Sequence, residues 1–225
     1  YDLKSGEGGV RYAPGTGIEV DLVYRATSGE YKSAQRYGDD GSALLCNNNC
    51  RKNDYDEDSL QARIQYRPSE DSSLGGFVGY TRRDYDQGNR NFRGLTAGFD
   101  TEWAVSGAVQ MRASLGRSIE PDDDAVTGSY ADTWSLNFSP TIQATGKITV
   151  EPYLRFYDRR YKGDQLAAGQ VERKDKIYMV GAEADYEFRR NMFLMASISR
   201  EQRDSNRANL DYKANVFGLG LKVQF

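Results

Sequence analysis

The chain has 225 residues, a net charge of −3 and a mean hydropathy of −0.75, with acidic and basic residues interspersed. No basic patch for nucleic acid is present, and no apolar run approaches the eighteen or so residues of a membrane helix. The 16 Tyr, 9 Phe and 23 Gly, with only 5 Pro and no His, favour strands and tight turns. We therefore expect an all-β protein. No linker or low-complexity tract divides it, so residues 1–225 are interpreted as one domain.

Apolar and polar residues alternate with a period of two, which is typical of strands with two different faces. In residues 18–25, for example, Ile18, Val20, Leu22 and Tyr24 share one face, opposite Glu19, Asp21, Val23 and Arg25. The same alternation predicts eleven strands, at residues 6–13, 18–25, 60–67, 75–83, 93–103, 109–116, 134–138, 148–159, 178–188, 192–202 and 216–225.

The connections between these segments alternate in length. One set is short, at residues 13–17, 68–73, 104–107, 139–147 and 189–191. The other set is on average longer and more polar, at residues 33–54, 86–90, 120–128, 162–172 and 205–211. Short turns at one end and long loops at the other are typical of bacterial outer-membrane barrels.

Two architectures fit this alternation. In a soluble sandwich or lipocalin-like barrel the apolar face would point inward, whereas in a transmembrane barrel it faces lipid. The apolar face favours the second, because it is aliphatic in mid-strand and aromatic near strand ends, as lipid-facing girdles are. The predicted girdle residues are Tyr24, Tyr66, Trp103, Trp134, Phe156, Tyr178, Phe188 and Phe225.

The predicted fold is thus an antiparallel transmembrane β-barrel in the bacterial outer membrane. Single-chain bacterial barrels have even strand numbers, with both termini in the periplasm. Eleven segments do not satisfy that rule. We therefore expect about 12 strands in this chain, or the C-terminal part of a larger barrel.

The polar face would then line an aqueous lumen. Strand direction predicts an acidic periplasmic mouth and arginines nearer the outside, a gradient that would draw an anionic chain outward. Tyrosines interleaved with these arginines could stack against sugar rings. The alternative is that Arg and Glu on neighbouring strands only pair across the sheet. The predicted lumen residues are Arg25, Arg83, Arg112, Arg155, Arg159, Arg203, Tyr153, Tyr157, Glu19, Asp21, Asp100, Glu102, Glu151, Asp185 and Glu187.

Catalysis and cofactor binding find little support in the sequence. Base catalysis by a serine or aspartate site usually needs a histidine, and the chain has none. Cys46 and Cys50 are predicted to form a small loop disulfide in an oxidising compartment rather than a metal site, which needs more ligands. We therefore expect no enzyme, no metal and no cofactor.

Three stretches carry a resemblance to a known family. "RYAPGTG" (11–17), "RRDYDQGNRNFRGL" (82–95) and "RDSN" (203–206) followed by "DYKANV" (211–216) resemble the EpsL-type barrels of exopolysaccharide biosynthesis operons. The closing segment "GLGLKVQF" also looks like the signal by which the barrel assembly machinery recognises outer-membrane proteins. The resemblance implies an outer-membrane exit for a biofilm-matrix polysaccharide, working beside a periplasmic polysaccharide export apparatus.

Two other functions are compatible with the pattern. The barrel could be a passive porin whose arginines select small anionic sugars, or a closed barrel whose loops serve adhesion or assembly. The expected partners are the polysaccharide, outer-membrane lipid and the assembly and export machineries, with no nucleic acid.

Overall fold

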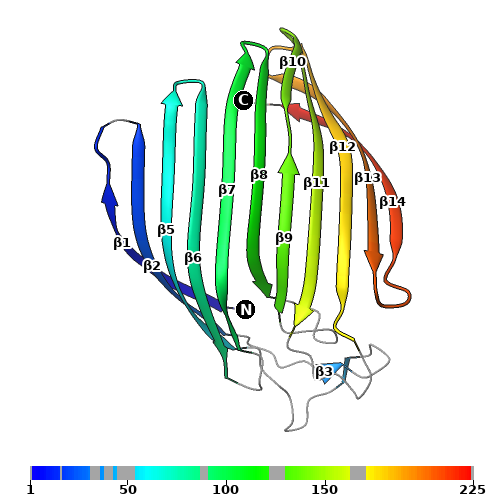
Figure 1. Ribbon diagram of the computed structural model, residues 1–225. Helices are drawn as coiled ribbons and strands as arrows, with labels where there is room; N and C mark the ends of the chain where they lie inside the picture. The colour runs from blue at the N-terminus through cyan, green and yellow to red at the C-terminus, as the bar shows by residue number, and fades with distance from the viewer. Residues whose placement is uncertain are drawn as a thin grey trace.

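The computed structural model describes residues 2–15, 17–30, 36–37, 43–44, 54–86, 91–121, 130–162 and 171–223. No helix in these ranges is long and apolar enough to cross a membrane. The described strands, shown in Figure 1, are β1 (Asp2–Tyr12), β2 (Ile18–Glu30), β3 (Arg36–Tyr37), β4 (Ala43–Leu44), β5 (Tyr55–Ser69), β6 (Ser72–Tyr85), β7 (Phe92–Ser106), β8 (Val109–Pro121), β9 (Tyr130–Phe138), β10 (Thr141–Thr145), β11 (Ile148–Lys162), β12 (Lys174–Arg189), β13 (Met192–Ser205) and β14 (Tyr212–Val223).

Twelve of these strands form one antiparallel sheet, in which sequence neighbours are also spatial neighbours. The prediction of an all-β antiparallel fold with about 12 strands is confirmed. β9 and β10 occupy a single position between β8 and β11, so each of the eleven predicted segments matches one position in the sheet. β3 and β4 pair separately.

The prediction that residues 139–147 form a turn is wrong for most of that stretch. The strand stops at Phe138 and resumes as β10, which pairs with β8 and β11. Pro140 lies in the break and has no N–H to donate to a ladder. The backbone N–H of Ser139 donates to the Arg112 carbonyl at 2.9 Å and holds the interrupted strand in place. Only Gly146 and Lys147 form the turn itself.

The short connections all lie at one end of the sheet, and the long ones at the other (Figure 1). The connection from β1 to β2 is fixed by backbone geometry, since Gly15 and Gly17 adopt φ of 81° and 74°, the left-handed region that favours glycine. The Gly17 carbonyl accepts a 2.8 Å hydrogen bond from the Arg67 N–H, which ties this turn to the end of β5. We call the two ends the turn end and the loop end.

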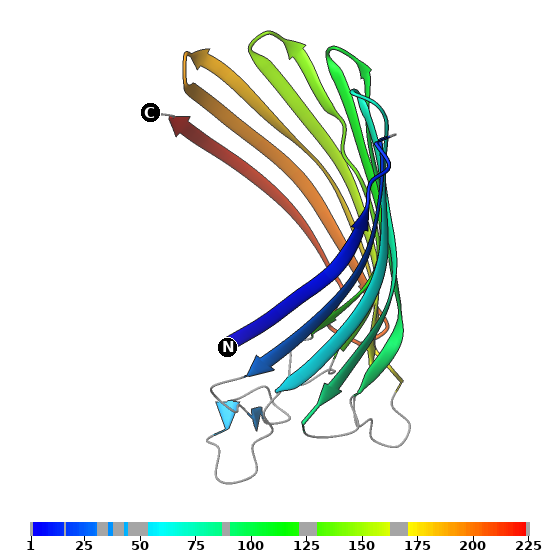
Figure 2. The ribbon, with the colours of Figure 1, turned by 90° about the vertical axis from the view of Figure 1, so that its left-hand side faces the viewer.

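The sheet is strongly curved (Figure 2), and its two faces differ in composition. One face is crowded, with Val23, Thr81 and Thr96 buried, and we assign it to the inside of the curve. The other carries large exposed apolar side chains, including Leu154 at 47% and Val180 at 54% exposed. A continuous apolar surface of this kind needs an apolar environment, which in a membrane barrel is the lipid.

Aromatic residues border this apolar outer face near both ends of the sheet. The strand register places six of the predicted girdle residues on the outer face: Tyr24, Tyr66, Trp103, Trp134, Phe156 and Tyr178. A seventh, Phe188, lies at the register shift of β12 and is 38% exposed. The rings of Phe156 on β11 and Tyr178 on β12 contact each other in a tilted arrangement, with centroids 5.0 Å apart. The eighth, Phe225, lies outside the described residues.

A central outer position gives a direct test of which face meets lipid. On β12, Ala182 lies midway between the outward-facing Tyr178 and Tyr186, whereas its neighbour Glu183 points inward. We expect Ala182→Arg to lower the free energy of unfolding in a bilayer by about 2–4 kcal/mol, because an arginine would enter the hydrocarbon core. Urea unfolding of bilayer-inserted protein measures the change.

The matched control is Glu183→Arg, which places the same side chain one residue away on the inner face. It is expected to leave the unfolding free energy nearly unchanged. Equal destabilisation by the two variants would contradict the assignment of the faces.

Candidate functional site

The candidate site is the inner wall of the curved sheet. Its residues are the odd-numbered positions of β2, β5, β6, β9, β11, β12 and β13 and the even-numbered positions of β7 and β8. Every predicted lumen residue falls on this face: Arg25, Arg83, Arg112, Arg155, Arg159, Arg203, Tyr153, Tyr157, Glu19, Asp21, Asp100, Glu102, Glu151, Asp185 and Glu187.

Five of the six predicted lumen arginines form ion pairs with carboxylates of neighbouring strands or segments. Arg83 on β6 donates through Nε to Glu57 on β5 at 2.7 Å, and both side chains are largely buried. Arg159 lies 3.4 Å from Glu120, and Arg112 lies 3.9 Å from Glu151. The remaining two pairs are Arg25 with Glu7 and Arg203 with Asp175. These pairs cancel much of the positive charge that the arginines would otherwise present to the lumen.

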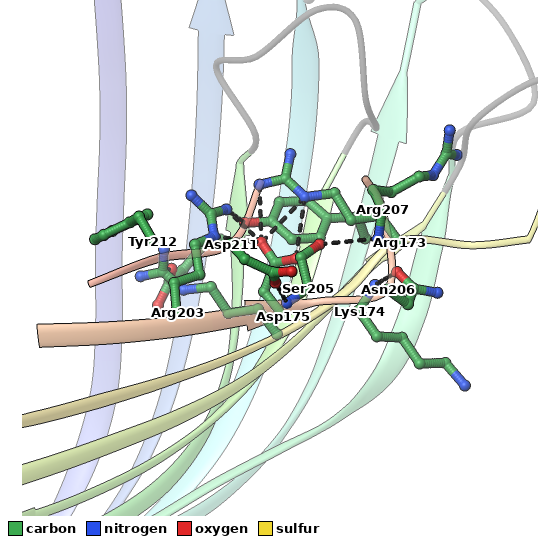
Figure 3. Close-up of polar contacts among 12 residues, drawn as sticks. Arg173, Lys174, Asp175, Arg203, Ser205, Asn206, Arg207, Asp211 and Tyr212 are labelled. Carbon is green, nitrogen blue, oxygen red and sulfur yellow. Dashed lines mark hydrogen bonds and ion pairs between the residues drawn. The ribbon is translucent and has the colours of Figure 1, made fainter. Parts of the chain in front are cut away.

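The largest of these clusters lies at the loop end and is centred on Asp175 of β12 (Figure 3). The Asp175 carboxylate is completely buried and accepts hydrogen bonds from two guanidinium groups, Arg173 at 2.8 Å and Arg203 Nε at 2.9 Å. The Arg173 guanidinium also lies 4.1 Å from the centre of the Tyr161 ring, within reach of a cation–π contact. The cluster thereby links β11, β12 and β13 at the loop end.

At the loop end, side chains of the connection between β13 and β14 also accept hydrogen bonds from backbone N–H groups. Asn206, which follows β13, exchanges hydrogen bonds with Lys174: its Oδ1 accepts from the Lys174 N–H at 2.8 Å, and its own N–H donates to the Lys174 carbonyl at 3.1 Å. Asp211 accepts from the Ser205 N–H at 2.5 Å across the connection to β14. These contacts fix how β13 returns into β14 (Figure 3).

The turn end of the inner wall is acidic. Asp100, Asp185 and Glu187 have no lysine or arginine within ion-pair distance among the described residues. Glu102 accepts a hydrogen bond from Gln110. Glu19 and Asp21 are compensated by Arg11, whose Nε lies 2.7 Å from Asp21, and by Arg67, 3.6 Å from Glu19. In outer-membrane barrels the short turns are periplasmic, so these carboxylates would lie at the periplasmic mouth.

Between the two ends, β11 carries a strip of tyrosines and arginines, comprising Tyr153, Arg155 and Tyr157. The Arg155 guanidinium lies 4.5 Å from the centre of the Tyr153 ring, and no carboxylate is within ion-pair distance of Arg155 in the described part of the chain. Gly181 on β12 leaves the space that the Tyr153 ring occupies, because a Cβ there would lie 2.6 Å from the ring. Tyr157 donates to Asn137 at 3.4 Å.

A second glycine accommodates an inner aromatic ring in the same way on the opposite part of the wall. A Cβ on Gly98 of β7 would lie 2.3 Å from the Phe77 ring of β6, the residue directly across the ladder. At both positions the missing glycine side chain makes room for an aromatic ring of the neighbouring strand.

Cys46 and Cys50 lie outside the described residues. Across the described ranges, no group of three or more Cys, Asp and Glu side chains is placed to hold a metal ion.

Several residues of the inner wall were not singled out from the sequence. Glu7, Glu57 and Glu120 partner the predicted arginines, and Asp175 with Arg173 forms the centre of the loop-end cluster. Alternation alone places a residue on a face but does not reveal its cross-strand partner. The short turns fix the register between neighbouring strands, and that register would have identified these cross-strand partners.

The fold and the two-faced wall together define a bacterial outer-membrane β-barrel protein. Residues 72–225 match the family described as "Putative beta-barrel porin 2", and the chain therefore belongs to this family. No curated protein sequence matches the chain.

Solved structures with a similar fold are large outer-membrane transporters and receptors. They include the copper transporter OprC (TM-score 0.64, 12% identity, 96% of this chain and 40% of that chain). The alcaligin receptor FauA of Bordetella pertussis (TM-score 0.58, 15% identity) matches 96% of this chain and 41% of its own. In FpvAI, solved with pyocin S2 (TM-score 0.58, 13% identity), the match covers 99% of this chain and 36% of that chain. The chain thus spans about two fifths of the length of these proteins, and at such low identity they share its fold alone.

Asp175 offers a test of the loop-end cluster. Replacing it by Asn removes the charge of a completely buried carboxylate that binds both Arg173 and Arg203, so we expect Asp175→Asn to lower the free energy of unfolding by about 3–5 kcal/mol. Denaturant unfolding of the folded protein in detergent micelles measures the loss.

Asp204 provides the control, because it is exposed on the outer face of β13 and accepts only a 2.9 Å hydrogen bond from Gln202. Asp204→Asn should change the unfolding free energy by no more than about 0.5 kcal/mol. If Asp175→Asn proved as stable as the control variant, the cluster would not contribute to the stability of the loop end.

Proposed function

We propose that this protein conducts a secreted exopolysaccharide through the outer membrane. The observation that carries the proposal is the Tyr153–Arg155–Tyr157 strip on the inner wall, which combines aromatic surface with the one predicted lumen arginine that lacks an ion pair in the described part of the chain. The resemblance of "RYAPGTG", "RRDYDQGNRNFRGL" and "RDSN…DYKANV" to the EpsL-type barrels supports the same function.

The chemistry of a moving glycan chain suits such a strip. Conduction needs sites that bind strongly enough to admit the chain and weakly enough to release it to the next site. The C–H edges of a sugar ring can rest on the negative face of a tyrosine ring, a contact that is broad and depends little on the exact sugar. Arg155 can add hydrogen bonds to hydroxyl or carboxylate oxygens.

The ends of the wall favour passage in one direction for an anionic glycan. Carboxylates without cationic partners at the turn end would repel such a chain from the periplasmic mouth once it has entered, and the unpaired Arg155 lies further out. The proposal includes a periplasmic export apparatus that delivers the chain to this mouth, and the barrel assembly machinery that inserts the protein.

Two alternatives remain as outcomes of the test. A passive porin for small anionic sugars receives less support, because ion pairs neutralise five of the six predicted lumen arginines. A closed barrel with adhesive or assembly loops would conduct neither sugars nor a glycan chain.

The decisive experiment compares strains of the native host for secreted and periplasmic glycan. Deletion is expected to abolish secretion and trap glycan in the periplasm. Complementation with the Tyr153→Ala/Tyr157→Ala variant should restore several-fold less secretion than the wild type, because the stacking surface is gone.

The control variant is Tyr66→Ala/Tyr80→Ala, which removes two tyrosines from the outer face instead. It should secrete normally once its membrane level matches that of the wild type. Unchanged glycan secretion after deletion would overturn the export function. Liposome flux of monosaccharides by the purified protein would then identify a passive porin, and absence of flux a closed barrel.

A further inference from the structure

A patch of basic side chains lies on the outer face of the sheet, away from the inner wall. It consists of Arg160 on β11, Lys174 and Lys176 on β12, Arg200 on β13 and Lys213 on β14, and we call these five residues the basic patch. All five are exposed. The four strands are consecutive in the sheet, as Figure 1 shows, so the patch spreads over neighbouring strands.

The basic patch lies at the edge of the lipid-facing band. On each strand, its residues occupy the first or second outward position beyond the last apolar one. Those last apolar residues are Phe156 on β11, Tyr178 on β12, Ile198 on β13 and Phe217 on β14. The patch therefore begins where the band ends, on the loop side, at the height of lipid headgroups in the outer leaflet.

The charge of the patch is only partly balanced by the protein. Asp158 on β11 and Asp204 on β13 each stand opposite Lys176 across the ladder, so the five cations of the patch meet two carboxylates. Arg160 and Lys174 stand directly opposite each other across the ladder, an arrangement of like charges that is destabilising. Arg160 has one weak partner, Asp158 at 3.6 Å. Within the described ranges, no carboxylate lies within 4 Å of Lys174, Lys176, Arg200 or Lys213.

Several outward-facing charges on β5, β6, β8 and β9 have close polar partners. On β5 and β6, Arg82 pairs with Asp84 at 2.5 Å, and Asp58 accepts a hydrogen bond from Tyr24. Further along, Arg117 on β8 is held by Asp132 on β9 at 2.8 Å. Arg93 on β7 has no carboxylate within 4 Å among the described residues either, and it stands opposite Arg82. On β5–β7, however, the outward carboxylates Asp56, Asp58 and Asp84 outnumber these two arginines, whereas cations outnumber carboxylates around the patch on β11–β14.

We propose that the basic patch binds the phosphate groups of an outer-leaflet glycolipid. Lysine and arginine are the side chains that recognise phosphate, and several of them at one membrane depth form a headgroup site. The ligand must be both anionic and held in the bilayer, because the apolar band directly below the patch contacts acyl chains. A glycan in the lumen cannot reach this face, so the site is independent of the proposed function.

The test uses the full protein in detergent micelles, with bis-phosphorylated lipid A as the probe and native mass spectrometry as the readout. The wild type should retain lipid A. The variant Lys174→Gln/Lys176→Gln/Arg200→Gln/Lys213→Gln should bind it at least about tenfold more weakly, because four charges near the headgroup are removed.

Two controls make the result specific. Arg82→Gln/Arg93→Gln removes two outward-facing arginines from β6 and β7, where acids are nearby, and should leave lipid A binding unchanged. Dephosphorylated lipid A should bind weakly to every variant. Folding of each variant is checked by the heat-dependent mobility shift of barrel proteins in gels, and a poorly folded quadruple variant is replaced by Lys174→Gln/Lys176→Gln.

Lipid A binding that survives loss of the four charges would overturn the proposal. Equal binding of the phosphorylated and dephosphorylated lipids would also overturn it, because the phosphates would then contribute nothing.

Discussion

The structure depends on one constraint: inside a bilayer, every backbone N–H and C=O must find a partner within the protein. The antiparallel ladders of the twelve-stranded sheet meet it except on the outer sides of β1 and β14, which no ladder joins among the described residues. Both edge strands run from the loop end to the turn end (Figure 1).

The same constraint explains which parts of the fold alternation could predict. Within the bilayer one face of each strand meets lipid and the other meets water, so a period of two is enforced. Beyond the apolar band both faces are polar, and the alternation disappears although the ladder continues. Residues 55–59 of β5 and 203–205 of β13 lie in such extensions, which the sequence did not predict. β10 was missed for another reason, because Pro140 resembles the start of a turn.

For the inner wall, the sequence predicted the face of each residue but not its contacts. Face follows from the parity of a position within its own strand, and this is local information. Contacts depend on register between strands, which joins residues as distant as Asp175 and Arg203, 28 positions apart. Arg173 precedes β12, where no alternation constrains it. The gradient of free arginines expected at the outer mouth was therefore an overestimate, because ion pairs that only register reveals cancel much of it.

The motifs that resemble the EpsL-type barrels have identifiable structural roles. Gly17 of "RYAPGTG" fixes a turn, Arg83 of "RRDYDQGNRNFRGL" is buried against Glu57, and Asn206 of "RDSN" joins β13 to β12. These residues hold strand ends together, a task that any barrel of this shape must perform whatever passes through it. Under the proposed export function, selectivity for a glycan would then come from inner-wall residues outside the motifs, where a substitution alters the inner face without loosening the sheet. Tyr153, Arg155 and Tyr157 meet that description, because Gly181 provides the space for the Tyr153 ring and the backbone ladder of β11 is independent of all three side chains.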